Sequence, residues 1–542
     1  MPEDLCAELI LTDCKVYTAD SKDTVAGAVA VKGGRIQRTG SADEVGKLRG
    51  KKTKVMKLGG RLVLPGFVDS HEHCIRKGME LDYVNCSNLH SIPEIVSALR
   101  AKVRGKKPGE WVVGTWFDES KMTEGRFPTR KDLDEASTVN PIYLGRAGGH
   151  NSVANSLALK TAGIGKNPKQ PTGGRIEVDK NGEPTGRLDE IAAMSIVKDR
   201  MPVPNPEETV ATLVENWPKV EEELLSWGIT SVHEAHIKAP EAQAYQELLS
   251  QGKLRMRVGL MLDGMAPYKG YATDDLSRQG VRTGFSWGDK LRVIGVKIGV
   301  DGAMGSHTAA LKEPYQGEPS NRGIIRVTQE ELSEETARCH AAKLRVCIHA
   351  IGDRAIDVAL NAVEEATKRG DWPTHRHRLE HVGLATPDQI ERMKRLGVGV
   401  SASIGFCLPI GDSHIDALGP ERTKFYYPMK SLMKAGIVTG GNSDGFGESW
   451  ALTGIDGCVN RRTTKGRLIG PKEAITVYDA IKAYTINGAW LEGAEAEKGS
   501  IEVGKHADLI VLNRDIIVET EHIASAMVQT AIVGGEVVYS RA

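Results

Sequence analysis

Two histidines at the end of an apolar run are the residues of this sequence most suited to chemistry. The stretch "RLVLPGFVDSHEH" (61–73) predicts a buried strand over 62–70 that leads directly into His71 and His73. Because alternate side chains of a strand point the same way, the two imidazoles share one face and Glu72 takes the other. Imidazole is the commonest metal-binding side chain, so this pair could begin a metal site.

The elements that must position these histidines follow further along the chain. Short apolar runs alternate there with helical patterns such as 329–343 and 386–397. With the first run they make eight strands, and eight strands alternating with helices predict an α/β protein built on a (β/α)8 TIM barrel. The seven later strands are expected at 228–236, 255–262, 292–301, 344–352, 377–383, 398–404 and 437–445.

Titratable side chains recur where these strands end, and in a barrel those ends converge on one site. Imidazole and carboxylate groups together suit zinc and related divalent metals. A single histidine at a strand end is more often a packed core residue, so the joint pattern carries the inference. Besides the first pair, the strand-end residues are His233 and His236, Lys297 just before Asp301, His349, His381 and Asp444.

The two ends of the chain differ in character from the middle. Both contain β-rich runs broken by Gly-Gly, at 33–34, 59–60 and 534–535, and such pairs signal two-residue hairpins. We therefore expect one β-sandwich built from residues 1–62 and 491–542, with the barrel domain at 63–490 between them.

The first two barrel strands are too far apart for an ordinary connection. The first ends near residue 70 and the second begins near residue 228, whereas most βα loops are only a few residues long. This spacing predicts an inserted subdomain at about 80–210, over the end of the first strand. A cap in that place could shape a substrate pocket and exclude water.

Composition excludes several classes of partner. The chain of 542 residues carries 71 basic and 71 acidic side chains, which gives no reason to expect a nucleic-acid or membrane-surface partner. No apolar run is long enough for a transmembrane helix, and the N-terminus carries acids where a secretory signal carries bases. The eight cysteines form no CxxC pair, which favours reduced thiols in a cytoplasmic protein. A homodimer through the β-rich ends stays open.

Several longer motifs resemble one enzyme family. The words "GFVDSHEH", "VKIGVDGAMGSHTAAL", "IHAIGDRAID", "RLEHV" and "GNSDGFGES" are similar to those of the amidohydrolase superfamily, in its YtcJ-like branch (amidohydrolase family 3). N-substituted formamide deformylases belong to that branch, and the resemblance covers nearly the whole chain. One position departs from the pattern: relatives often carry Asp before the Gly-His of the insertion, where this chain has Gly148. That difference favours a different substrate.

The resemblance implies a role for most of the strand-end residues. His71 and His73 would hold the more buried metal together with Asp444, and His349 and His381 would hold a second one. Lys297 would bridge the two as N6-carboxylysine, because an ammonium group has no acceptor with which to bind a cation. The cofactor would be one or two divalent metal ions per chain, and zinc is the metal we expect. Residues that would line the substrate, or equally pack the structure, are Trp116, His150, His236, Asp301, Gly302 and Met304.

The same resemblance implies hydrolysis of a C–N bond of amide, N-acyl or N-formyl type in a small molecule. Metal-activated hydroxide would attack, and Asp444 would carry the proton to the leaving nitrogen. The same site could instead open lactones or cyclic amides, or deaminate a ring, and the fold does not choose among these. A catalytically inactive binding protein is the alternative of another class; a missing ligand would favour it, but competent residues occupy all six positions.

Overall fold

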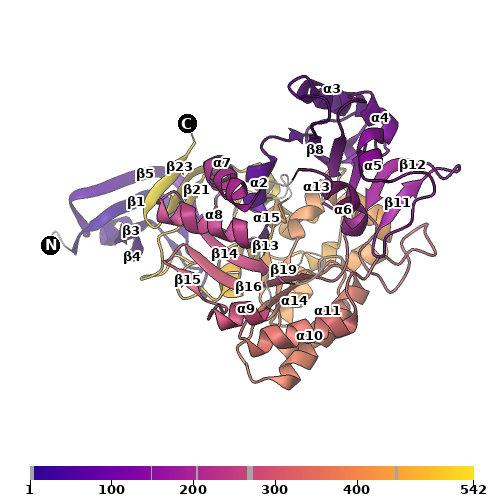
Figure 1. Cartoon of the computed structure of the whole chain (residues 1–542). Helices are drawn as coiled ribbons and strands as arrows, with labels where there is room; N and C mark the ends of the chain where they lie inside the picture. Colours follow the sequence, from indigo (N-terminus) through magenta and orange to yellow (C-terminus); the bar gives the residue numbers. More distant parts are fainter. Residues whose placement is uncertain (1–4, 148, 203–204, 265–272, 446–449, 542) are drawn as a thin grey trace. The chain divides into compact units, whose positions relative to one another are not determined.

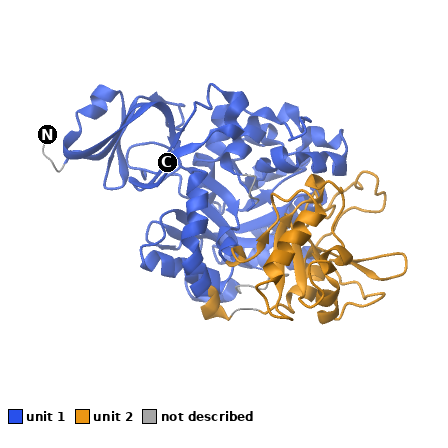
Figure 2. Cartoon of the chain, turned by 90° about the horizontal axis from the view of Figure 1, so that it is seen from above, with its two compact units in different colours: residues 1–78, 210–300, 327–542 blue, residues 79–209, 301–326 orange. Residues whose placement is uncertain are grey.

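The computed structural model describes residues 5–147, 149–202, 205–264, 273–445 and 450–541. These residues form two compact units (Figure 2). Unit one comprises residues 1–78, 210–300 and 327–542, and unit two comprises residues 79–209 and 301–326.

Unit one contains a parallel β-barrel. Each strand pairs in parallel with the next along the chain, which confirms the predicted TIM barrel. The seven later strands are all present, although most are shorter than their apolar runs. The eight strands are β6 (Phe67–Glu72), β13 (Ile229–Ile237), β14 (Arg257–Asp263), β16 (Leu291–Gly299), β17 (Val346–Ala350), β18 (Arg378–His381), β19 (Gly399–Ala402) and β20 (Thr439–Gly441).

The first expected strand is divided at Gly66, so the prediction of one strand over 62–70 was wrong. Residues before this glycine belong to β5 (Arg49–Pro65) in another sheet, and β6 begins at Phe67. A Cβ on Gly66 would lie 2.1 Å from Thr230 Oγ1. The chain can therefore cross between the two sheets here only because the residue has no side chain.

Hydrogen bonds outside a regular ladder join the last barrel strand to the first. Ser70 Oγ donates to the carbonyl of Gly441 (2.8 Å), and the amide of Asp444 donates to the carbonyl of His71 (2.9 Å). The buried carboxylate of Asp69 accepts from the amide of Ser443, at 3.2 Å for either oxygen. These contacts bring the ends of β6 and β20 together and nearly close the barrel.

Helices follow the barrel strands in the alternating pattern that the sequence predicted. The two expected helices at 329–343 and 386–397 are confirmed: the second has a Thr386 capping box and ends at Gly397 in the left-handed conformation. No helix in the part of the chain that the structure describes is long and apolar enough to cross a membrane. The helices are α2 (Cys74–Glu80), α7 (Pro206–Ser226), α8 (Ala239–Ser250), α9 (Thr273–Arg278), α10 (Gln329–Ala341), α11 (Asp353–Arg369), α12 (Pro387–Leu396), α13 (Cys407–Leu418), α14 (Met429–Lys434), α15 (Ala451–Asn460), α16 (Val477–Ala483) and α17 (Ile486–Glu492).

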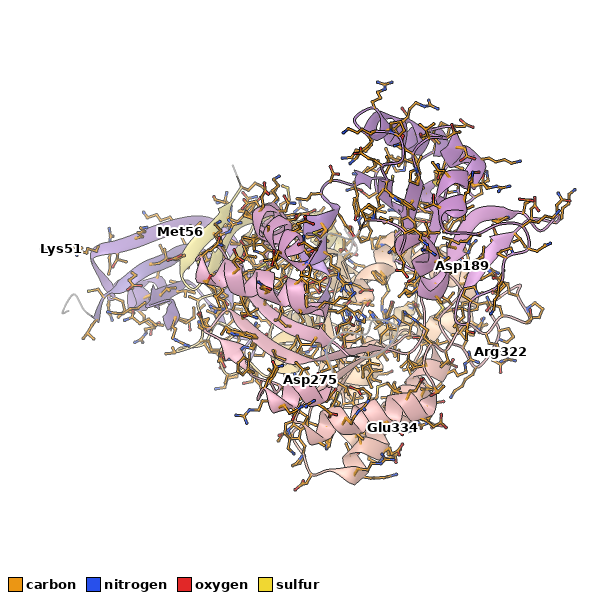
Figure 3. All side chains as sticks on the ribbon, viewed as in Figure 1. Lys51, Met56, Asp189, Asp275, Arg322 and Glu334 are labelled. Carbon is orange, nitrogen blue, oxygen red and sulfur yellow. The ribbon has the colours of Figure 1, made fainter. Side chains whose placement is uncertain are left out.

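Strands from both ends of the chain share a second sheet in unit one (Figure 1). The order is β23-β22-β21-β5-β1-β3-β4, and side chains such as Leu11, Val63 and Val511 form its buried core. Met56 of β5, labelled in Figure 3, packs against that core. The strands are β1 (Ala7–Tyr17), β3 (Ala28–Lys32), β4 (Arg35–Gly40), β5, β21 (Leu509–Leu512), β22 (Val528–Val533) and β23 (Glu536–Ser540).

Two of the three Gly-Gly pairs form the predicted hairpins. Residues 33–34 link β3 to β4 and residues 534–535 link β22 to β23, with positive φ at all four glycines. The hairpin expected at 59–60 was wrong, because β5 continues through that pair. It stays paired with β1 on both sides of the glycines, which make only a register shift.

Unit two has a sheet of its own, covered by short helices. Its strand order is β11-β12-β10-β9-β8-β7, and residues 301–326, which follow β16 in the chain, cluster with it. Asp189 at the end of β12, labelled in Figure 3, binds the side chains of Arg175 and Arg187. The elements are β7 (Val84–Asn85), β8 (Val112–Phe117), β9 (Ile142–Arg146), β10 (Asn151–Ala154), β11 (Arg175–Val178), β12 (Pro184–Asp189), α3 (Ile92–Val103), α4 (Arg130–Asp134), α5 (Ser156–Thr161) and α6 (Glu190–Lys198).

Three buried histidines pack together near the N-terminal end of β18. The ring of His375 stacks on that of His377 (centroids 4.3 Å apart), and His340 Nδ1 lies 2.9 Å from His377 Nε2. His377 Nδ1 accepts from the amide of Val346, so its Nε2 carries the proton and donates to His340. Burial, with His340 and Arg345 nearby, lowers the pKa of His375 to about 4.

This cluster makes stability depend on pH. An unfolded histidine gains a proton below about pH 6.5, whereas folded His375 stays neutral down to about pH 4, so acid favours the unfolded state in that window. We expect the melting temperature of wild type to fall by about 1–3 °C more than that of His375→Asn between pH 7.5 and pH 5. Asparagine keeps an acceptor for the amide of His377 and does not titrate. Equal falls in the two proteins would contradict this interpretation.

Candidate metal centre

Three of the predicted ligands converge closely at the C-terminal end of the barrel. His71 Nε2 lies 3.5 Å from Asp444 Oδ1, and His73 Nε2 lies 3.3 Å from the same oxygen. One ligand atom from each residue can be chosen so that all three lie within 4.8 Å of one another. Two imidazole nitrogens and a carboxylate oxygen at this spacing fit a divalent cation of the zinc type.

The other three predicted ligands adjoin this group. Lys297 Nζ lies 2.8 Å from His71 Nε2. The ring of His381 lies 4.9 Å from that of His71, and the ring of His349 lies 4.5 Å from that of His381. All six predicted ligands therefore belong to one cluster within unit one.

Left-handed backbone at two positions directs side chains into the cluster. His381 has φ 74° and Asp444 has φ 55°, conformations that L-residues rarely adopt and that collect at functional sites. Arg378 and Glu380 share one face of β18, so regular alternation would turn His381 away from them. The positive φ at the end of the strand breaks that alternation.

Burial shapes the charge state of the cluster. Burial and the neighbouring Lys297 lower the pKa of His71 to about 3, so its ring is neutral and can offer a lone pair. Burial also lowers the pKa of Lys297 to about 8. Burial alone would raise the pKa of Asp444, but His381 and the first two histidines hold it well below its usual range.

The two histidines predicted at the end of the second strand have different surroundings. The ring of His236 stacks on that of His73 at 5.9 Å, and its Nδ1 lies 2.8 Å from the buried carboxylate of Asp263. His233 instead faces Arg378, with its Nδ1 3.0 Å from Nη1. Of these two histidines, His236 contacts a predicted ligand directly, through the stacking of its ring on His73.

A carboxylate that the sequence analysis did not select orders the chain just after the histidine pair. Glu234 Oε2 accepts from the amides of Cys74 (3.1 Å) and Ile75 (3.2 Å), which begin helix α2, and from Tyr245 Oη (2.8 Å). The thiol of Cys74 also donates a hydrogen bond to this oxygen. Cys74 is fully buried, which agrees with a packing role. Glu234 thus caps the helix whose start fixes the backbone of His73.

The residues predicted to line the substrate from unit two gather partly around another missed residue, Glu190. His150 Nδ1 lies 3.2 Å from both carboxylate oxygens of Glu190, which is buried and has φ 64°. A Cβ on Gly302 would lie 2.7 Å from Glu190 Oε1, so that glycine permits the close approach.

The remaining substrate candidates lie in other settings within unit two. Asp301 accepts from the amide of Ala310 (2.8 Å) and Met304 is buried. Trp116 has φ 68° and donates from Nε1 to Glu80 (3.3 Å). Gly148 lies outside the described residues. Their contact with a substrate stays a prediction.

Comparison with known proteins agrees with this arrangement. A profile described as "Amidohydrolase family" matches residues 54–539. The chain belongs to the amidohydrolase family. The N-substituted formamide deformylase of Arthrobacter pascens is 32% identical over 514 residues, 94% of each chain. The putative amidohydrolase YtcJ of Bacillus subtilis (strain 168) is 31% identical over 541 residues, 97% of this chain and 98% of the relative.

A solved structure extends the likeness to three dimensions. An uncharacterized metal-dependent hydrolase from Pyrococcus horikoshii OT3 superposes with a TM-score of 0.73 at 29% identity. The match covers 94% of this chain and 98% of that one. These findings confirm the family resemblance and the fold that the motifs predicted.

The junction between the first and last barrel strands makes a testable prediction. Asp69→Ala removes the acceptor of two buried amides, those of His71 (3.1 Å) and Ser443. Each orphaned donor costs about 1–3 kcal/mol, so urea unfolding should show a loss of that order per amide. Asp69→Asn keeps an acceptor oxygen and should lose less. If the alanine variant is as stable as the asparagine variant, the junction does not have this role.

Proposed function

We propose that this protein is a metal-dependent hydrolase that cleaves a non-peptide C–N bond, of amide, N-acyl or N-formyl type, in a small molecule. The convergence of His71, His73 and Asp444, with Lys297 beside them, is the observation that carries the proposal. The name of the formamide deformylase relative points to a carbonyl–nitrogen bond as the target.

The residues of the cluster would have two tasks, which are to bind the metal and to transfer a proton. His71, His73 and Asp444 would hold one divalent ion, with His349 and His381 beside it for a second. Such an ion lowers the pKa of water and polarises a carbonyl. Asp444 would take the proton from the attacking water at its carboxylate and deliver it to the leaving nitrogen as the C–N bond breaks. Its side chain is 23% exposed, so water can reach it.

Lys297 would act as a carbamate rather than as an ammonium. Its pKa, lowered to about 8 by burial, leaves part of the side chain as the neutral amine near pH 7.5. That amine can add carbon dioxide and release a proton, which gives an anion with two oxygens. We propose zinc as the metal because histidine and carboxylate ligands suit it. We place the protein in the cytoplasm, since none of its eight cysteines forms a disulfide.

A panel of small substrates tests the proposal. With zinc present, N-formyl and N-acyl amines should yield a free acid and an amine in equal amounts. Chromatography measures both products over time. Asp444→Asn should lower kcat by about 10²–10⁴-fold, because it removes the proton carrier. Lactone opening without amine release, or ammonia as the only nitrogen product, would favour another reaction. Full activity in the asparagine variant would refute the role of Asp444.

Replacement of Lys297 tests the bridging carbamate. Lys297→Ala should lower both zinc content and activity, because the cluster loses an anionic ligand. Acetate or propionate at high concentration should restore part of both, by filling the space with a carboxylate. Zinc content is measured by elemental analysis beside the rate. Full zinc content and activity without any added acid would contradict the carbamate.

A further inference from the structure

We propose that Glu380, held by Arg378, is a positioning residue that fixes the ring of His71 for metal binding. The inference rests on the proposed function, because it concerns a ligand of the proposed metal centre. Glu380 was not among the residues that the sequence analysis selected, although it directly precedes His381. Both Glu380 and Arg378 are fully buried inside the barrel.

The contacts of His71 define which of its nitrogens can bind a cation. Nδ1 lies 2.5 Å from Glu380 Oε2, and an ionised carboxylate only accepts hydrogen bonds. Nδ1 therefore carries the ring proton, and the lone pair is on Nε2. That nitrogen faces Lys297 Nζ at 2.8 Å and Asp444 Oδ1 at 3.5 Å. Glu380 thus selects the tautomer that presents Nε2 to the metal centre.

Arg378 keeps this carboxylate ionised and oriented. Its Nε donates to Glu380 Oε1 (2.6 Å) and its Nη2 donates to Oε2 (2.9 Å), a two-point contact that suits the planar guanidinium. The two residues lie two positions apart on β18, so they share the inner face of the strand. Arg378 Nη2 also donates to the carbonyl of Ser70, the residue before His71. Strand β18 therefore holds both the ring of His71 and the adjoining backbone.

The buried charges continue on the other side of Arg378. Its Nη1 donates to His233 Nδ1, and His233 Nε2 lies 3.3 Å from Glu492 Oε2. Lys498 Nζ lies 2.5 Å from the same oxygen of Glu492. Glu492 is thus a second buried carboxylate of this network, separated from His71 by His233, Arg378 and Glu380. It offers a control that disturbs the network without touching a metal ligand.

Zinc affinity of two matched variants tests the proposal. Glu380→Gln and Glu492→Gln each replace one buried carboxylate of the same network by an amide of the same size. Zinc dissociation constants are measured on the full chain by competition with a chromophoric chelator, beside a melting curve for each variant. Loss of an outer partner of a metal-binding histidine typically costs 10–100-fold in affinity, and we expect about that from Glu380→Gln. Glu492→Gln should change affinity by no more than about threefold.

The outcomes separate this inference from the proposed function. Wild type that binds no zinc refutes the metal centre itself. Wild-type affinity in a folded Glu380→Gln, or equal weakening in both variants, refutes the positioning role alone. If Glu380→Gln does not fold, the pair Arg378→Met with Glu380→Met removes both charges, an exchange that buried ion pairs often tolerate. That double variant should also bind zinc about 10–100-fold more weakly, and unchanged affinity would overturn the inference.

Discussion

A few hydrogen bonds between the first and last barrel strands set the geometry on which the candidate metal centre depends. His71 and Asp444 are separated by most of the chain, yet the amide of one donates to the carbonyl of the other. Asp69 accepts from the amide of His71 and from that of Ser443, so one buried carboxylate spans both strand ends. With this junction made, the ligands on the strands between are brought to the same end of the barrel.

The charges gathered there have to be compensated inside the protein. Isolated buried charges are costly, so each one is met by a partner of opposite sign or by hydrogen bonds. Arg378 compensates Glu380, and Lys498 compensates Glu492. The network therefore serves the fold as well as the site, and its members on β18 also orient the ring of His71. Burial lowers the pKa of Lys297 to about 8, which favours its neutral amine form.

The barrel and the nearness of its strand-end residues could be predicted from sequence because both depend on local pattern. Apolar runs give the strands, and the parallel barrel then brings residues such as His349 and His381 together. The division at Gly66 could not be predicted, since it depends on the nearby side chain of Thr230. The pairing that carries β5 past Gly59 and Gly60 is likewise set by a partner strand.

Supporting residues were harder to find than ligands. Glu234, Glu190 and Asp263 act through partners distant in sequence, and nothing local distinguishes them from ordinary acids. Glu380 could have been recognised from the sequence. With Arg378 it places opposite charges two residues apart in an apolar strand, next to a predicted ligand. Charged pairs on the inner face of a buried strand are rare enough to be read as support for a site.

The central claim is that these residues bind a metal, and the most direct test is the metal content of the purified chain. Elemental analysis after expression with added zinc should find at least one ion per chain, and less metal in a variant that lacks both His71 and His73. A value near two would favour the centre bridged by carboxylated Lys297, and a value near one would favour a single ion at His71, His73 and Asp444. Wild type that retains no metal, with or without added zinc, would contradict the account.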